Sequence, residues 1–351
     1  MRYKRMRPQD LLVLRSEGLY CPPGDFFIDP FRPCARAVVT HGHSDHARAG
    51  HGDVLATEAT VAIMRARLGE NAAARFQPAG YGEKIRIGEA DVTLHPAGHI
   101  LGSAQVLLEW RGLRIVFSGD YKREADPTCA AFETVRCHVF VTEATFGLPV
   151  FRRPPPGDEI EKLRASLRRS PQRWHIVGAY ALGKAQRLIA ELRASGDDRP
   201  IFLHGAALKL CALYERFGIR FGALELATAQ AAKSSAPGLA ICPPSALQDR
   251  WSQKFGDAVR GMASGWMQVK GRARQRNVEL PLILSDHCDW TDLQTTILDT
   301  GAEEIWITHG QEDALKRWCE LQGVAARPLN LVGYEGEEEG QEQALAGAAD
   351  A

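Results

Sequence analysis

The stretch that decides the fold is Thr40-His41-Gly42-His43-Ser44-Asp45-His46. It follows the apolar run 37–39, so it is predicted to lie at the C-terminal end of a strand. Folding alone rarely requires three imidazoles and one carboxylate so close together, and both groups suit zinc and similar divalent ions. Alternate side chains of a strand-end loop can point to different ions. We therefore expect His41 and His43 on one metal, and Asp45 and His46 turned toward a second.

Three further candidate ligands each follow a strand-like run. They are His99 after Val92–Pro96, Asp120 after Leu113–Ser118, and His309 after Glu304–Thr308. Because α/β sheets gather their sites at the C-terminal ends of strands, we expect these residues to meet the 41–46 loop. Two other histidines are predicted to stay outside the site: His95, packed within its strand or supporting a ligand, and His51, exposed to solvent.

Composition indicates an ordinary globular protein. The 351 residues include 43 Lys and Arg against 43 Asp and Glu, with 45% hydrophobic and 25% charged residues. No apolar run reaches the roughly 18 residues that span a bilayer. The basic N-terminus is not followed by an apolar stretch, so we expect a cytoplasmic protein without a membrane partner. The 8 cysteines form no Cys-x-x-Cys pair and are expected to be reduced thiols.

Strand-like and helix-like runs alternate, which favours an α/β layered architecture. Residues 58–68 are predicted to be a helix, and Arg111-Gly112 is predicted to be a tight hairpin turn. A proline-rich connector over 152–158 cannot continue either kind of element. We therefore expect four segments: a first domain over 1–150, an inserted domain over 151–276, the return of the first domain over 277–331, and an acidic, disordered tail over 332–351.

The order of the ligands resembles the metallo-β-lactamase fold, which is an αββα sandwich. The resemblance implies two zinc ions, with manganese as an alternative, that share Asp120. It implies that the first ion takes His41, His43 and His99, and that the second takes Asp45, His46 and His309. Asp29 resembles the family's aspartate that supports the ligand loop, and its physical role would be a hydrogen bond to a ligating histidine.

Three more motifs resemble those of the β-CASP nucleases within this fold. They are Val141–Gly147, Leu284–Asp289 and Thr308–Glu312, with Gln311 at the position where the family usually has a glutamate. The long interval between Asp120 and His309 would then hold a β-CASP-like α/β cap. Pairing of Glu143 with His287 gives an acid that can protonate a leaving oxygen. Together with Asp45, these two residues are the catalytic candidates.

The inserted segment offers candidate nucleic-acid contacts. Lys184 lies at a predicted helix start, where free N–H groups can bind phosphate. The segment 261–267 resembles the Ser-Gly-Met segment of the cap, so Ser264 is a candidate contact and Trp266 can stack on a base. Four alternating cations would share one face of an extended strand: Lys270, Arg272, Arg274 and Arg276. The alternatives are an ordinary helix start, core packing of Trp266 and a solvated charge run.

The lead-in 19–25, with Ile28-Asp29-Pro30, is similar to the start of the bacterial ligase-associated DNA exonucleases. This resemblance implies a DNA exonuclease of DNA repair that works beside an ATP-dependent DNA ligase and a helicase. A ribonuclease of the same family that processes RNA 3′ ends is the main alternative. A small-molecule thioester or lactam hydrolase fits less well, because it needs neither the insertion nor Glu143 and His287. A non-catalytic scaffold for the ligase could dispense with the metal ligands.

Overall fold

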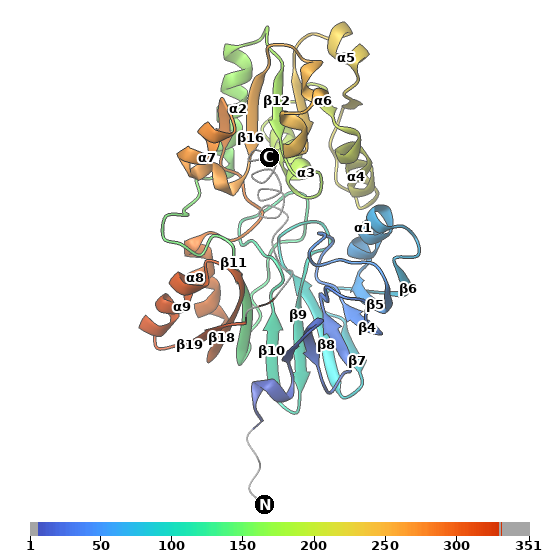
Figure 1. Ribbon diagram of the computed structural model, residues 1–351, viewed down its shortest axis with the longest axis vertical. Coiled ribbons are helices and arrows are strands. Elements are labelled where there is room, and N and C mark those ends of the chain that lie inside the picture. The colour runs from blue at the N-terminus through green and yellow to red at the C-terminus, as the bar shows by residue number, and fades with distance from the viewer. Residues whose placement is uncertain (1–5, 330, 332–351) are drawn as a thin grey trace, which may run out of the picture. The chain divides into compact units, whose positions relative to one another are not determined.

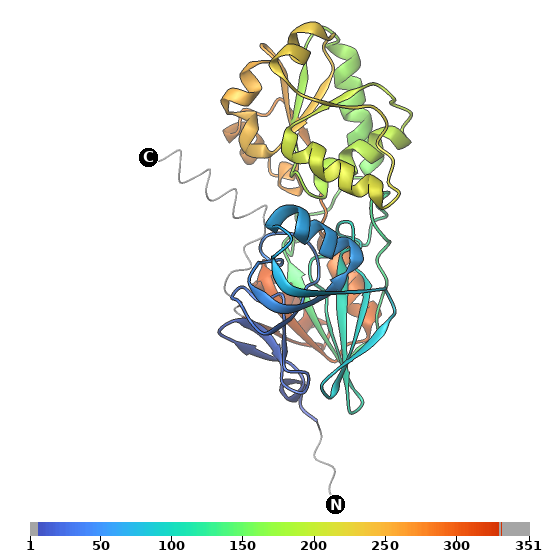
Figure 2. The same ribbon diagram turned by 90° about the vertical axis from the view of Figure 1, so that its right-hand side faces the viewer.

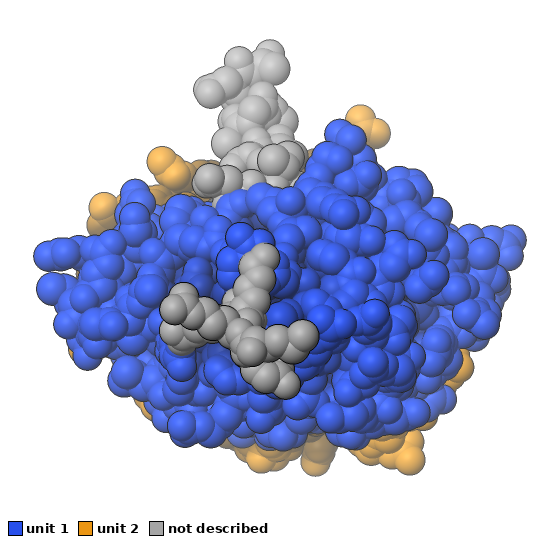
Figure 3. Space-filling view, turned by 90° about the horizontal axis from the view of Figure 1, so that it is seen from below, with its two compact units in different colours: residues 1–125, 129–151, 287–351 blue, residues 126–128, 152–286 orange. Residues whose placement is uncertain are grey.

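A computed structural model describes residues 6–329 and 331 (Figure 1). The chain divides into two compact units, which Figure 3 colours separately. Unit 1 comprises residues 1–125, 129–151 and 287–351, and unit 2 comprises residues 126–128 and 152–286. The predicted α/β class is confirmed, since helices and strands alternate along both units. The tail predicted to be disordered, 332–351, lies outside the described residues.

The first sheet of unit 1 is formed by the N-terminal strands in chain order. Its strands are β1 (Val13–Arg15), β2 (Gly18–Cys21), β3 (Phe26–Ile28), β4 (Arg36–Val38), β5 (His51–Thr57) and β6 (Ala73–Ala79). The first three strands pair antiparallel, and β3 to β6 pair parallel. A short 3₁₀ helix, η1 (Pro8–Asp10), precedes them.

The second sheet of unit 1 has the order β19-β18-β11-β10-β9-β8-β7. Its strands are β7 (Lys84–Ile87), β8 (Ala90–Pro96), β9 (Ala104–Trp110), β10 (Leu113–Phe117), β11 (Val139–Ala144), β18 (Glu304–Gly310) and β19 (Ala325–Pro328). Strands β7 to β10 form an antiparallel meander, and β10, β11, β18 and β19 pair parallel. The predicted turn at Arg111-Gly112 is confirmed, and both residues have positive φ, as a type I′ hairpin turn requires.

Apolar side chains pack the two sheets of unit 1 face to face. Their shared core includes Val38 and Leu55 from the first sheet, and Val106 and Val141 from the second. Burying each such side chain contributes about 1.5–3 kcal/mol. Helix α1 (Glu58–Leu68) covers the outer face of the first sheet. The other outer face packs against α8 (Trp290–Thr300) and α9 (Glu312–Leu321), so the layers run helix, sheet, sheet, helix (Figure 1).

Unit 2 has one parallel sheet with the order β14-β13-β15-β12-β16-β17, and helices flank it (Figures 1 and 2). The strands are β12 (His175–Gly178), β13 (Ile201–Leu203), β14 (Leu224–Leu226), β15 (Leu239–Cys242), β16 (Val259–Ala263) and β17 (Leu280–Leu282). The helices are α2 (Pro156–Arg169), α3 (Lys184–Ala194), α4 (Gly205–Arg216), α5 (Ala229–Ser234), η2 (Pro244–Leu247), α6 (Arg250–Gln253), η3 (Gly265–Gln268) and α7 (Lys270–Gln275). Each parallel step requires a crossover, which the helices supply.

The return to unit 1 begins later than the predicted residue 277. The run 278–285 was expected to be a strand of the first domain, but β17 pairs parallel with β16 and completes the sheet of unit 2. The chain re-enters unit 1 at His287. Among the helices of the described residues, none is both long and apolar enough to cross a bilayer.

Candidate metal centre

Parallel pairing brings the ends of β10, β11 and β18 to one edge of the second sheet. Asp120 follows β10, while Glu143 and His309 lie near the ends of the other two strands. Between β11 and β18 the register shifts: Thr142 pairs with Ile307 and Ala144 pairs with Gly310, so Thr308 and His309 of β18 lie opposite the single residue Glu143. Such a bulge re-aims the side chains it contains, here those of Thr308 and His309. The strand topology therefore brings the side chains of Asp120, Glu143 and His309 to one edge of the sheet.

The position of His309 beside β11 depends on Gly310, where β18 lies very close to the Ala144 backbone. Gly310 has φ +97°, which L side chains rarely adopt. A Cβ at this position would lie 2.3 Å from the backbone carbonyl carbon of Ala144. Only glycine therefore lets the chain turn directly after His309 while it stays in contact with β11.

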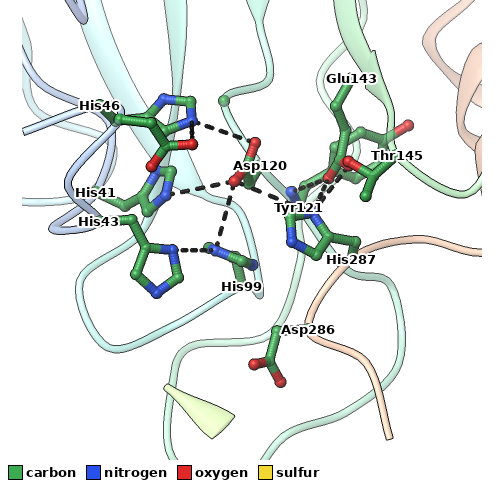
Figure 4. Close-up of polar contacts among 12 residues, drawn as sticks. His41, His43, His46, His99, Asp120, Tyr121, Glu143, Thr145, Asp286 and His287 are labelled. Atoms are coloured by element: carbon green, nitrogen blue, oxygen red, sulfur yellow. Dashed lines mark hydrogen bonds and ion pairs between the residues drawn. The ribbon is translucent and has the colours of Figure 1, made fainter. Parts of the chain in front are cut away.

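Asp120 lies at the centre of the candidate site and divides its two carboxylate oxygens between two groups of histidines (Figure 4). Its Oδ2 lies 3.5 Å from Nε2 of His41 and 3.7 Å from Nε2 of His99. Its Oδ1 lies 3.4 Å from Nε2 of His46 and 3.7 Å from Nε2 of His309. A carboxylate placed in this way can bridge two ions.

His43 joins the group on the Oδ2 side. Its Nδ1 lies 3.0 Å from Nε2 of His99, and both rings are buried. Two nitrogen ligands of one tetrahedral zinc lie about 3.3 Å apart, because each Zn–N bond is about 2.0–2.1 Å long. The two nitrogens are therefore spaced like ligands of a common ion. Asp45 belongs to the other side, where its Oδ2 lies 3.6 Å from Nε2 of His46.

Two threonines fix the tautomer of the histidine that follows each of them. The Thr40 hydroxyl donates to Asp29 at 2.6 Å, so at 3.0 Å it must accept the Nδ1–H of His41. The Thr308 hydroxyl donates to the Thr142 carbonyl at 3.2 Å, so at 3.0 Å it must accept the Nδ1–H of His309. Both imidazoles then present the lone pair of Nε2 to the site, which is the form that ligates a metal.

Asp29 has the supporting role that the sequence predicted. Its Oδ2 accepts a hydrogen bond of 2.7 Å from Nδ1 of His46, and its Oδ1 accepts the Thr40 backbone N–H at 2.8 Å. The residue is completely buried and adopts φ +43°. It thus orients His46 and the start of the ligand loop together.

The buried charges move the pKa values of the candidate ligands. Burial holds the pKa of His41 well below its usual value, and the neighbouring His46 lowers it further, so His41 is neutral. Burial alone would also lower the pKa of His46, but Asp120 and Asp45 raise it well above the usual value. Burial opposes ionisation of Asp120, yet His46 and His287 hold its pKa well below the ordinary one. A neutral imidazole and an ionised carboxylate are the protonation states that bind cations, so these shifts favour binding at His41 and Asp120, whereas His46 must release a proton when a cation binds.

The donor set fits divalent cations. Nε2 of His41 and Oδ1 of Asp120 are both buried, and within the described residues neither atom forms a hydrogen bond. Three groups of side chains have ligand atoms within 4.8 Å of one another: His41, His43, His99 and Asp120; Asp45, His46 and Asp120; and Asp120, Glu143 and His309. This buried cluster can hold metal. In this geometry His309 groups with Asp120 and Glu143, and it reaches the Asp45 and His46 side only through Oδ1 of Asp120.

Beside the cluster, Glu143 and His287 form a hydrogen-bonded pair (Figure 4). Nδ1 of His287 lies 2.9 Å and 3.0 Å from the two carboxylate oxygens of Glu143. The carboxylate also accepts the backbone N–H of Tyr121 at 2.9 Å and the hydroxyl of Thr145. Because Nδ1 is engaged, Nε2 of His287 is the nitrogen that can exchange a proton with another molecule. Nδ1 lies 4.0 Å from Oδ2 of Asp120, so the pair adjoins the candidate ligands.

Three of the residues predicted to contact nucleic acid are buried: Lys184, Ser264 and Trp266. Lys184 is 1% exposed and forms an ion pair with Asp286 at 3.1 Å. Ser264 is buried and its side chain caps η3. Trp266 is 4% exposed, and the Arg272 guanidinium lies 4.0 Å from its ring centroid; this burial favours packing within unit 2 over base stacking.

The row of alternating cations is helical, not extended. Residues 270–275 form α7, so the predicted single cationic face is wrong. Arg276 directs a guanidinium nitrogen to the Met262 sulfur at 3.5 Å. Lys270 and Arg274, one helical turn apart, are the exposed members of the row.

His95 and His51 lie outside the metal groups, as predicted. Nδ1 of His95 lies 3.1 Å from the Glu133 carboxylate. The expectation of a solvated His51 is wrong, because it is 2% exposed and its Nδ1 lies 3.5 Å from the Cys34 sulfur.

Four supporting residues were not predicted from the sequence: Thr40, Thr308, Tyr121 and Thr145. The first two had a recognisable signal: Thr-His-Gly occurs at 40–42 and again at 308–310, each time at the end of a strand. Tyr121 contributes through its backbone N–H, which no side-chain pattern reveals.

Comparisons with known proteins place nucleases among the relatives of the chain. No family model matches. A "Probable DNA ligase" of Opitutus terrae is 32% identical over 321 residues, which is 89% of this chain and 30% of that protein. "Endoribonuclease ysh-1" of Neurospora crassa is 30% identical over 38% of this chain and 17% of that protein. "Cleavage and polyadenylation specificity factor subunit 3" of Dictyostelium discoideum is 29% identical over 33% of this chain and 15% of that protein.

The chain therefore spans less than a third of each of these relatives. Among solved structures, a protein of unknown function from Enterococcus faecalis V583 superposes with a TM-score of 0.59 at 14% identity. The match covers 83% of this chain and 78% of that one, so it shows a common α/β fold and nothing about activity.

Proposed function

We propose that the chain is a metal-dependent nuclease that hydrolyses phosphodiester bonds of DNA, as a β-CASP member of the metallo-β-lactamase fold close to the ligase-associated DNA exonucleases. One observation carries the proposal: the two oxygens of Asp120 face separate groups of buried histidines, with the Glu143–His287 pair beside them. The sequence similarity to named endoribonucleases supports a hydrolase acting on nucleic acid.

The proposed centre holds two zinc ions, with manganese as an alternative. Its ligands would be His41, His43 and His99 on one side, Asp45, His46 and His309 on the other, and Asp120 between them. Cations bound there would acidify an attacking water and neutralise charge on the phosphate. The orientation of the histidines by Thr40, Thr308 and Asp29 supports this assignment.

Glu143 and His287 supply the proposed acid. Glu143 orients the imidazole through Nδ1, and Nε2 of the protonated ring donates its proton to the departing 3′-oxygen. As the bond from phosphorus to that oxygen breaks, the oxygen takes the bonding electrons and the proton. Water supplies the new oxygen on phosphorus and the product carries a 5′-phosphate. His287 is then neutral and regains a proton from solvent before the next cycle.

DNA is the favoured substrate because the similarity to the protein named a probable DNA ligase covers most of this chain. The same similarity supports an ATP-dependent DNA ligase as partner. A helicase partner, a role in DNA repair and a cytoplasmic location are proposed from the family resemblance. The second candidate is a ribonuclease that processes RNA 3′ ends, favoured by the endoribonucleases that match about a third of the chain.

The test is digestion of end-labelled single-stranded and double-stranded DNA and matched RNA, with elemental analysis of metal on the same preparation. We expect metal-dependent cleavage of DNA in preference to RNA. Asp120→Ala should lose bound metal and at least about a hundredfold in rate. His95→Ala is the matched control, because His95 lies outside the metal groups and should leave both measurements unchanged. Wild-type rates in Asp120→Ala with metal present would refute the proposal, and preferential cleavage of RNA would select the second candidate.

A further inference from the structure

Unit 2 contains a cluster of buried charges that the proposed mechanism does not use. It consists of Lys184 and Arg187 on α3, Asp286 in the segment after β17, and Asp126 in the segment 126–128. The side chains of the two cations are 1% exposed, and those of Asp286 and Asp126 are 5% and 2% exposed. Transfer of four charges from water is costly, and a buried ion pair rarely adds net stability over apolar packing. A role in fixing geometry explains such a cluster better than a role in stability.

The contacts converge on two consecutive residues, Ser285 and Asp286. Nζ of Lys184 lies 3.1 Å from one Asp286 oxygen, and Nη1 of Arg187 lies 3.6 Å from the other. The same guanidinium donates to the carbonyl oxygen of Ser285, which also accepts from Arg153 at 3.2 Å. Positively charged side chains therefore contact both the Asp286 carboxylate and the Ser285 backbone carbonyl.

The residue that follows is His287, and the chain is fixed again directly beyond it. The backbone N–H of Cys288 donates to the Tyr121 carbonyl at 2.8 Å. The N–H of Tyr121 in turn donates to Glu143, the partner of His287. His287 thus projects from a backbone that is anchored on both sides.

We propose that Lys184 and Arg187 are positioning residues for His287, and that they act by clamping Ser285 and Asp286. This inference replaces the expectation that Lys184 binds phosphate. It rests on the proposed function, because the acid role of His287 belongs to that function. A small displacement of a proton donor reduces the rate of proton transfer and leaves substrate binding intact, so the clamp should act on kcat and spare KM.

The first measurement needs no activity. Hydrogen exchange of peptides covering 284–290 is compared among the wild type, Lys184→Met and the milder Asp286→Asn. Arg193→Met is the matched control: Arg193 lies on the same helix and donates to the carbonyl oxygens of 197, 199, 221 and 223, away from the clamp. We expect faster exchange over 284–290 in the first two variants and wild-type exchange there in the control. Unchanged exchange in both clamp variants overturns the proposal.

The second measurement separates positioning from general stability. It uses a DNA oligonucleotide whose cleaved linkage has sulfur in place of the 3′-bridging oxygen, because a thiolate departs without a proton. Lys184→Met and Asp286→Asn should lose about tenfold to a hundredfold in kcat on the oxygen substrate, with KM unchanged and little loss on the sulfur substrate. His287→Ala should show the same selectivity, and Lys184→Arg should restore part of the rate.

Equal losses on both substrates overturn the positioning role, and so does a wild-type oxygen-to-sulfur ratio in both clamp variants. If the wild-type protein cleaves neither substrate, the proposed function fails. The exchange measurement still decides whether the clamp exists.

Discussion

Asp120 is the residue on which the site depends, because each of its oxygens serves a different group of histidines. Its carboxylate stays ionised in a buried place because His46 and His287 hold its pKa well below the ordinary value. The sequence identified it from its position after an apolar run and from the metal-ligand motif elsewhere in the chain. The same reasoning identified His41, His99 and His309, since strand ends can be predicted from local patterns.

The supporting hydroxyls lead to a prediction at single residues. Thr308→Val removes the acceptor that fixes Nδ1–H of His309, so the imidazole can rotate or take the other tautomer. We expect metal affinity to fall by about 10–100-fold, as for other residues that orient a ligand. Competition with a chromophoric chelator measures the affinity. Thr308→Ser retains the hydroxyl and should bind metal nearly as the wild type does; equal affinities in the valine and serine variants would show that the hydroxyl does not orient His309.

Charged residues of unit 2 were predicted less well than the candidate ligands, and the reason is physical. Lys184 looks like a phosphate contact in sequence because its partner, Asp286, is far away in the chain. Trp266 could equally stack on a base or pack in a core, and only the fold decides between these roles. Burial of a polar or aromatic side chain is a tertiary property that a local pattern does not contain.

At the scale of elements, local sequence patterns correctly predicted a helix from its residue pattern and a hairpin turn from its turn residues. Helix α1 has the predicted bounds, 58–68, and the hairpin turn at 111–112 is correct. The alternation of cations over 270–276 matches a strand, but short runs of charged residues are also good helix formers, and α7 forms there. Strand β17 was assigned to the wrong sheet because a short apolar run does not indicate its neighbours.

The pairing of β11 with β18 gives a prediction at this scale. Gly310→Ala requires a Cβ in a left-handed conformation and 2.3 Å from the Ala144 backbone, so the end of β18 must move away from β11. Gly112→Ala is the matched control, because Gly112 also has positive φ but has open space around its Cα. The control should lose about 1–2 kcal/mol of unfolding free energy from the conformation alone.

Gly310→Ala should lose more than this control and should also bind less metal, because His309 shifts with the strand. Urea unfolding gives the free energies, and elemental analysis gives the metal content. Equal losses in the two variants, with full metal content in both, would mean that close contact between β11 and β18 is not needed to place His309.

At the scale of the whole molecule, every candidate ligand belongs to unit 1, although the chain leaves that unit and returns to it between Asp120 and His309. The site is complete only when segments from both ends of the chain meet in the second sheet. Sequence patterns predicted that unit 1 is interrupted by an inserted domain, but they placed the return of the chain to unit 1 at residue 277 instead of His287. Composition does not mark the residue at which the chain stops packing against unit 2 and begins to pack against unit 1. Because the candidate ligands come from chain segments that precede and follow unit 2, cation binding should stabilise the folded state of unit 1.

This arrangement predicts which segments lose local stability when metal is removed. A ligand that binds only the folded state at a hundred times its dissociation constant adds about 2.7 kcal/mol of stability. Chelation should thus speed hydrogen exchange in 40–46, 118–121 and 306–310 of unit 1, while β12 and β15 of unit 2 exchange as before. Asp120→Asn should exchange like the chelated protein whether or not chelator is present, since its site no longer joins the two groups of histidines. Uniform acceleration across both units, or none in unit 1, would contradict a cation site built from unit 1 alone.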